Sequence, residues 1–252
     1  MMRILIIGMS NVGDAVLMSP VVQRLFSAFP EARLTLLIGE RARVVFEEDR
    51  RIHQVVSFEE FEGVMGRLRL VDWMWRLHPD VVVDLRQTVL PILWRPWRAL
   101  AYFWPVPRRI VHMRDRHLWR LRRQVPVLRH LQVTSDKRQV TSEGTSGLLG
   151  LTNEEFTSVE RLMKAWAINP QTPLVVISPG ARSHIKRWYP DRVARLADRL
   201  IDAHRATVAF TGEVDEASFI NDILTTMRHR AHNTAGRITL RQAAALMQQA
   251  AL

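Results

Sequence analysis

The sequence contains no cysteine. This absence excludes a disulfide framework, a thiolate nucleophile and a metal site with cysteine ligands. The chain also lacks an apolar run of about 18 residues, which a membrane-spanning helix needs. The run Ile4–Ile7 is short and enters a polar loop, so it does not read as a cleavable signal peptide. We therefore expect a cytoplasmic protein.

Of the 252 residues, 47% are apolar and 24% are charged, which is ordinary for a globular protein. This length is enough for one large hydrophobic core or two modest ones. The formal net charge is +11, so the chain has a strong excess of basic side chains.

The basic charge is concentrated in the segment Arg86–His130. It holds eleven arginines, no lysine and one acid, Asp115, and six of the eight tryptophans lie between Trp73 and Trp119. Arginine mixed with tryptophan suits an anionic membrane surface, where indole rings lie at headgroup level and guanidinium groups pair with phosphate. A solvated basic face with ordinary core tryptophans is an equal alternative. No recognised nucleic-acid motif accompanies the charge, so we expect no nucleic-acid partner.

Short apolar strands alternate with helical patterns in the first part of the chain. The helical spacing is clearest at Met18, Val21, Val22 and Leu25, and Pro20 inside it is expected to kink the helix or to start a new turn. Strands are predicted at Arg3–Gly8, Arg33–Ile38, Gln54–Ser57, Asp80–Leu85 and Arg109–His112. This alternation predicts an α/β fold with a mainly parallel sheet that is covered on both faces.

The proline-containing segment 169–173 predicts a domain boundary, with domains at 1–168 and 173–252. A helix is predicted before it, at 153–167. After it, strands are predicted at Leu174–Ser178 and Thr207–Thr211, and helices at Pro190–Ala203 and Asp215–Arg228. A last helix starts at Thr239, where Gln242 completes a capping box.

Two loops are candidate sites, because each leaves a strand and enters a helix. The first, Met9–Gly13, ends at Asp14, and it matches neither a Walker loop nor a GxGxxG fingerprint. Asp14 is suited either to acting on a substrate or to stabilising the start of its own helix. The second loop, Pro179–Arg187, carries Gly180 and Lys186, which suits either a nucleotide diphosphate or an exposed basic loop.

Four segments, in this order, resemble glycosyltransferase family 9, the heptosyltransferases that add heptose to the inner core of lipopolysaccharide. They are RILIIGMSNVGDAVLMSPVVQRLFSAFPEARLTLLIG, SPGARSHIKRWYPDRVARLADRL, TGEVDEASF and NTAGRITLRQAAALM. The resemblance implies a GT-B fold, with two Rossmann-like domains that have mainly parallel sheets. The first domain would bind the acceptor and the second a nucleotide sugar, usually ADP-heptose. Transfer would invert the anomeric centre.

The resemblance also implies roles for individual residues. Asp14 matches the general base, and Lys186 matches the lysine that stabilises the leaving diphosphate. Glu216 matches the acid at the nucleotide ribose, and Ile238 an apolar contact near the base. The remaining donor-binding candidates are Ser10, Asn11, Gly13, Gly180, Ala181 and Arg182.

The sequence contains no Asp-x-Asp pair, the usual metal-diphosphate clamp of the other large glycosyltransferase fold. We therefore expect no metal site and no cofactor besides the donor substrate. The implied acceptor is an anionic, lipid-linked glycan, which predicts a cytoplasmic protein that is peripheral to the inner membrane.

The family continues past residue 252 with a glycine-rich turn that contacts the donor, and this chain has no match to it. We therefore expect a C-terminally truncated chain, with an incomplete second domain and little or no transferase activity. Two alternatives remain open within this interpretation. One is a non-catalytic remnant that binds membranes or nucleotides, and the other is a family 9 transferase with a different donor sugar.

Overall fold

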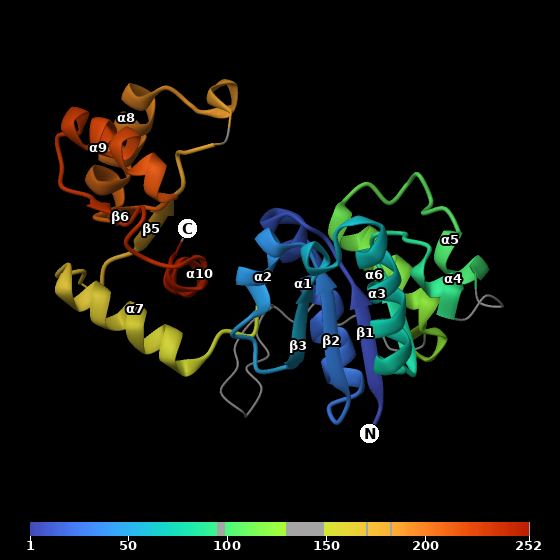
Figure 1. Ribbon diagram of the computed structural model, residues 1–252. Coiled ribbons are helices and arrows are strands. Elements are labelled where there is room, and N and C mark those ends of the chain that lie inside the picture. Colours follow the sequence, from blue (N-terminus) through green and yellow to red (C-terminus); the bar gives the residue numbers. More distant parts are fainter. Residues whose placement is uncertain (95–98, 130–148, 170, 182, 252) are drawn as a thin grey trace. The chain divides into compact units, whose positions relative to one another are not determined.

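A computed structural model describes the chain except for residues 95–98, 130–148, 170, 182 and 252 (Figure 1). The chain forms two compact units, Met1–Thr152 and Asn153–Leu252. Each unit is an α/β structure built on a parallel sheet. None of the helices in the described residues is both long enough and apolar enough to cross a bilayer.

The sheet of the first unit has four strands in the order β3-β2-β1-β4, and every neighbouring pair is parallel. The strands are β1 Arg3–Ile7, β2 Arg33–Ile38, β3 Ile52–Ser57 and β4 Val81–Asp84. The predicted strands at these four places are confirmed to within two residues. Their nearly continuous apolar sequences are typical of parallel strands that are covered on both faces.

Helices cover both faces of this sheet (Figure 1). Ile4 and Ile6 point into a core formed with α1 Val12–Ala28, α2 Glu40–Phe46 and α6 Met113–Gln124. Leu5 and Ile7 point the opposite way, because side chains alternate along a strand. They pack against the second group of helices. That group comprises α3 Gly63–Leu77 and α4 Leu90–Trp94.

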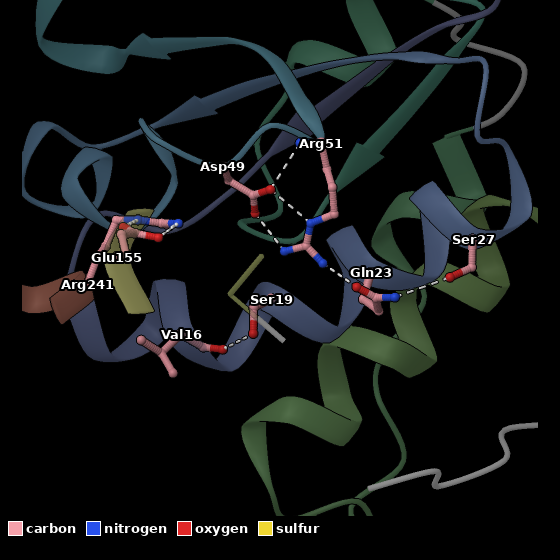
Figure 2. A network of polar contacts seen from close by, with 8 residues as sticks. All are labelled: Val16, Ser19, Gln23, Ser27, Asp49, Arg51, Glu155 and Arg241. Atoms are coloured by element: carbon pink, nitrogen blue, oxygen red, sulfur yellow. Dashed lines mark hydrogen bonds and ion pairs between the residues drawn. The ribbon is translucent and has the colours of Figure 1, made fainter. Parts of the chain in front are cut away.

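The helix α1 is continuous through Pro20, where the sequence predicted a kink or a new turn. Proline has no backbone N–H, so the carbonyl of Val16 loses its usual partner four residues on. The Ser19 hydroxyl donates to that carbonyl instead, over 2.7 Å (Figure 2). A side chain thus replaces the hydrogen bond that the proline removes.

The segment between α2 and β3 contains a buried ion pair (Figure 2). The Arg51 guanidinium donates to both carboxylate oxygens of Asp49, over 2.9 and 2.6 Å, and its third nitrogen donates to Gln23 of α1. Asp49 is 2% exposed and Arg51 is 6% exposed. Such a pair is tolerated inside a protein because each charge is met by an opposite charge and by hydrogen bonds.

The predicted strand Arg109–His112 is wrong, because this segment forms a turn and irregular backbone before α6. The edge of β4 that the strand would have paired with is covered by α6. The Gln124 side chain accepts from the Asp84 N–H and donates to the Asp84 carbonyl, over 2.7 and 2.8 Å. It therefore satisfies the same backbone groups that a neighbouring strand would satisfy.

The second unit has a parallel sheet in the order β5-β6-β7. Its strands are β5 Leu174–Ile177, β6 Thr207–Phe210 and β7 His232–Asn233, and its longer helices are α7 Asn153–Ala165, α8 Pro190–His204, α9 Ala217–Thr226 and α10 Leu240–Gln249. Strand β7 was not predicted, because two residues are too few to show a periodic pattern. The capping box of Thr239 and Gln242 at α10 is confirmed.

The two compact units divide between Thr152 and Asn153, earlier than the boundary predicted at 169–173. The reason is that α7 packs against α10 of the second unit. Arg241 of α10 donates two hydrogen bonds to the Glu155 carboxylate of α7, one of them over 3.0 Å, and Arg241 is 3% exposed.

The remaining short helices connect these elements. They are η1 Phe58–Phe61, α5 Ala99–Phe103, η3 Pro126–Arg129, η4 His184–Lys186 and η5 Val214–Glu216.

Candidate active site

The loop after β1 lies at the carboxyl edge of the sheet in the first unit, where parallel sheets bind ligands. It packs tightly against the loop after β2. The Gly39 N–H donates to the Met9 carbonyl over 3.2 Å, and a Cβ on Gly39 would lie 2.5 Å from the Cβ of Ser10. Only glycine therefore fits at this position. Its close contact with Met9 and Ser10 supports the loop that carries Ser10 and Asn11.

The first turn of α1 exposes backbone donors at this edge. Asn11 is the N-cap residue, but its side chain makes no capping hydrogen bond to the helix. The first N–H groups of a helix have no partner inside it, and together with the helix dipole they favour an anion. Gly13 lies in this turn, and a Cβ there would have no neighbour within 4 Å.

Asp14 lies in the same turn and is half-buried. Its Oδ2 accepts one long hydrogen bond of 3.5 Å from Asn11 Nδ2. The structure thus brings together four of the predicted site residues in one loop and one helical turn, namely Ser10, Asn11, Gly13 and Asp14.

Arg86 also lies at this edge, and sequence reasoning did not single it out from the basic segment. Its guanidinium donates to Ser10 Oγ over 2.8 Å and lies 4.7 Å from the ring centre of Phe58. Arg86 therefore places positive charge beside the Ser10 loop. Its position directly after β4 is the signal that could have found it, because the ends of β1 and β4 are neighbours.

The loop that carries Arg86 is shaped by the fully buried carboxylate of Asp84. That carboxylate accepts from the N–H groups of Arg86, Gln87 and Thr88 over 2.9, 2.8 and 2.6 Å. Burial raises the pKa of Asp84, although these hydrogen bonds oppose the rise. The role of Asp84 is therefore to hold the loop rather than to contact a ligand.

His117 of α6 is fully buried near Asp14. Neither ring nitrogen has a hydrogen-bond partner among the described residues. The pKa of His117 is lowered to about 4, chiefly by burial and also by the charges of Arg120 and Arg116, while the charge of Asp14 opposes the shift. His117 is therefore neutral at pH 7. Sequence reasoning missed it, because nothing in its local sequence marks it as buried.

In the second unit, the loop after β5 carries Gly180, Ala181 and Lys186. Arg182 lies outside the described residues. Arg187 supports the loop from within, because its Nε donates to the Ala181 carbonyl over 2.9 Å and its guanidinium lies 5.2 Å from the Phe219 ring centre. Lys186 is exposed and forms no ion pair with the described residues. One basic side chain thus holds the loop and the other faces solvent.

Glu216 lies between the loops that follow β5 and β6. A Cβ on Gly180 would lie 2.0 Å from Glu216 Oε1, and a Cβ on Gly212 would lie 2.7 Å from Oε2. Both glycines therefore make room for this carboxylate. Glu216 Oε2 also accepts from the Glu213 N–H over 3.0 Å, so it caps its own short helix.

The loop after β7, which carries the predicted Ile238, lies at the same edge of the sheet. The Gly236 N–H donates to the Gly212 carbonyl over 3.2 Å, and the φ of Gly236 is +68°. Ile238 follows in this loop and is half-buried. The predicted residues Gly180, Ala181, Lys186, Glu216 and Ile238 therefore lie in the loops at the carboxyl edge of one sheet.

The predicted residues form two groups, one in each unit. Within the part of the chain that the structure describes, no three His, Asp or Glu side chains gather as a metal site would require.

Three solved structures show the same fold. The glycosyl transferase family 9 structure from Veillonella parvula DSM 2008 has a TM-score of 0.75 and 17% identity, and the match covers 99% of this chain and 74% of that one. For ADP-heptose lps heptosyltransferase II of E. coli, the TM-score is 0.68 and the identity 19%, with 99% and 77% covered. For E. coli heptosyltransferase WaaC with ADP, the TM-score is 0.62 and the identity 14%, and the match covers 99% of this chain and 79% of that one.

Comparison with curated proteins returned no match. The family model described as glycosyltransferase family 9 (heptosyltransferase) matches residues 108–252, which is more than half of the chain. The expected GT-B-like fold class, α/β with parallel sheets, is confirmed by the structures. The chain is a member of glycosyltransferase family 9, the heptosyltransferase family.

Proposed function

We propose that this glycosyltransferase moves a heptose from ADP-heptose to the inner core of lipopolysaccharide, with inversion at the anomeric carbon. The observation that carries the proposal is that a chain of this family has two strand-end sites, one in each unit. One presents Asp14 in an uncapped helical turn, and the other presents Lys186 in an exposed loop. A carboxylate and a lysine are the two charges that such a displacement requires.

In this mechanism, Asp14 accepts the proton from the acceptor hydroxyl while that oxygen attacks the anomeric carbon. A sugar hydroxyl is a weak nucleophile, so a carboxylate within hydrogen-bond reach increases the rate. The bond from the anomeric carbon to the diphosphate oxygen breaks as the new bond forms. ADP leaves with the bonding electron pair.

Negative charge develops on the leaving diphosphate, and Lys186 is the side chain proposed to stabilise it. Ser10, Asn11 and Gly13 are proposed to lie beside the diphosphate, with the backbone N–H groups of α1 as further donors. Gly180, Ala181 and Arg182 form the donor loop of the second unit. Glu216 would accept from the ribose hydroxyls, and Ile238 would contact the base. No metal is part of the proposed mechanism.

The proposed acceptor is an anionic lipid-linked glycan at the cytoplasmic surface of the inner membrane. Arg86 supports this proposal, because it brings a guanidinium to the edge of the sheet beside Ser10. A guanidinium binds phosphate groups with a fitting geometry. The protein would then be cytoplasmic and peripheral to that membrane.

The donor site is tested by the substitution Lys186→Ala. We expect it to weaken ADP binding about ten- to hundredfold, because a charge-assisted contact to phosphate contributes roughly 1.5–3 kcal/mol. Lys164→Ala in α7 is the matched control, since Lys164 is also exposed and lies in the same unit. Calorimetry with ADP measures both. Equal ADP affinities for the two variants would contradict the assigned role.

Gly13→Ala tests the phosphate contact at α1. Its Cβ meets no atom of the protein, and alanine is favoured over glycine within a helix by up to about 1 kcal/mol. We therefore expect unchanged or slightly raised stability in urea unfolding, together with a loss of donor affinity in calorimetry. The comparison is Gly39→Ala, which we expect to destabilise the fold because its Cβ would collide with Ser10. Undiminished donor affinity in Gly13→Ala would contradict a ligand at this turn.

Nucleotide-binding and transfer assays with the unmodified protein distinguish the two alternative functions. Tighter binding of UDP or GDP than of ADP would favour a family 9 transferase with another donor. Binding of ADP-heptose without transfer in a single-turnover assay would favour a non-catalytic nucleotide-binding protein.

A further inference from the structure

The helix α3 carries an apolar stripe on its outer side. Val64, Met65, Leu68 and Trp75 are 76%, 71%, 61% and 55% exposed. The spacing from Val64 to Leu68 and on to Trp75 is four and then seven residues, which places these side chains on one side of a helix. The opposite side, with Leu70 and Met74, is buried against the sheet. Large apolar side chains grouped in this way mark an interaction surface.

Arginines lie on both sides of this stripe. Arg67 borders it on one side, and Arg69 and Arg76 border it on the other, and all three are exposed. Asp72 is the acid within α3, and it is paired with Arg76 over 2.8 Å, while Glu62 lies directly before the helix. An apolar stripe between rows of basic side chains is the pattern of a helix that lies in the interface of an anionic membrane.

The aromatic residues around α3 fit the same environment. Trp75 packs edge-to-face against Trp94 of α4, with ring centroids 5.5 Å apart, and the Trp94 indole donates to the Pro79 carbonyl. This hydrogen bond fixes the orientation of the Trp94 ring, while Trp75 remains more than half exposed. Partly exposed indole rings are favoured at the depth of lipid headgroups.

The basic segment of α6 is less suited to this role, because several of its arginines are used inside the first unit. Arg120 donates to the Leu85 carbonyl and to Gln87 over 2.8 Å each. Arg123 lies 4.9 Å from the ring centre of Trp104. The charge that the sequence concentrates in this segment is therefore partly structural.

A second copy of the chain is a poorer occupant of the α3 stripe than a membrane. Two copies that met through this stripe would bring two sets of Arg67, Arg69 and Arg76 into one interface. Like charges held close together at an interface are unfavourable. An anionic lipid surface instead complements all three arginines.

We infer that α3 is the membrane-docking element of this protein. Its apolar stripe enters the headgroup region of an anionic phospholipid leaflet, and its arginines bind the lipid phosphates. The helix begins directly after β3 and η1, at the carboxyl edge of the sheet that also carries Asp14. Docking through α3 would therefore place that edge near a lipid-linked acceptor. The inference rests on the proposed function for its acceptor, but its test involves no transfer reaction.

Because the chain has no cysteine, a single introduced cysteine reports on one site. We propose Leu68→Cys labelled with an environment-sensitive fluorophore, with Leu196→Cys on α8 as the control at another exposed helical leucine. Vesicles of phosphatidylcholine with 30% phosphatidylglycerol are expected to raise and blue-shift the emission of the Leu68 label only. Vesicles of phosphatidylcholine alone are expected to leave both labels unchanged.

Co-sedimentation with the same vesicles at low salt gives a second, label-free measurement. We expect Arg67→Ala and Arg69→Ala each to weaken binding about fivefold, because one basic side chain near such a surface contributes about 1 kcal/mol. Arg199→Ala on α8, also exposed, is expected to change binding less than twofold. Circular dichroism of each variant checks that it is folded.

Three results would overturn the inference. The first is no co-sedimentation with anionic vesicles at low salt. The second is co-sedimentation without any change at the Leu68 label, which would assign docking to another surface. The third is a change at that label with rising protein concentration and no vesicles, which would assign the stripe to a second copy. Loss of transferase activity with intact vesicle binding would count only against the proposed reaction.

Discussion

Asp14→Asn is expected to lower the rate of heptose transfer by about 10²- to 10⁴-fold, the usual contribution of a general base. Asparagine has nearly the same shape as aspartate but cannot accept the proton. Because the group that changes is proposed to contact the acceptor hydroxyl, donor binding should be preserved. Single-turnover transfer from ADP-heptose measures the first effect, and calorimetry with ADP measures the second.

The control for this prediction is Asp191→Asn. Asp191 is also a first-turn carboxylate, in α8, and it pairs with Arg195 at the exposed surface. Each substitution removes a favourable helix-dipole interaction of about 0.3–1 kcal/mol. If both variants kept the parent transfer rate, Asp14 would be a helix-start residue, the alternative that its sequence position leaves open.

Asp49→Ala is expected to lower the free energy of unfolding of the first unit by about 3–5 kcal/mol. The substitution leaves the Arg51 guanidinium, 6% exposed, without its carboxylate partner. A buried charge that loses its counter-charge is strongly destabilising. Six of the eight tryptophans belong to the first unit, so tryptophan fluorescence during urea unfolding reports mainly on it.

The matched comparison is Asp72→Ala, which breaks the exposed pair with Arg76 in the same unit. Surface pairs of this kind contribute about 0–1 kcal/mol, since water and salt screen them. Replacing Asp49 and Arg51 together with apolar residues should recover much of the lost stability, because no charge is then left buried. A loss of less than 1 kcal/mol for Asp49→Ala would contradict the structural role of the pair.

Much of the fold follows from local patterns that the sequence displays. The first four strands, the helix from Pro190 and the capping box at Thr239 were predictable, because each depends on apolar periodicity or on a short capping motif. Strand β7 and the place of α7 were not predictable. Both depend on partners that are distant in sequence, namely Phe210 of β6 and Arg241 of α10.

The candidate site divides in the same way. Family resemblance and loop position pointed to Asp14, Lys186 and Glu216. The structure added Arg86, because the neighbouring ends of β1 and β4 bring it to Ser10. It also distinguished Arg187, which supports its own loop, from Lys186, which is exposed. Two adjacent basic residues look alike in a sequence, and only their contacts separate them.

The sequence by itself therefore determined the α/β class, the family and the order of the strand-end loops, since all three are recorded in local patterns along the chain. The tertiary structure decided which charged side chains are buried, which are exposed and which lie at the carboxyl edge of a sheet. The inference that α3 docks to a membrane also depends on the structure, because the apolar stripe of α3 is recognisable only once its buried side is known. Burial depends on which elements pack together, and no local pattern contains that information.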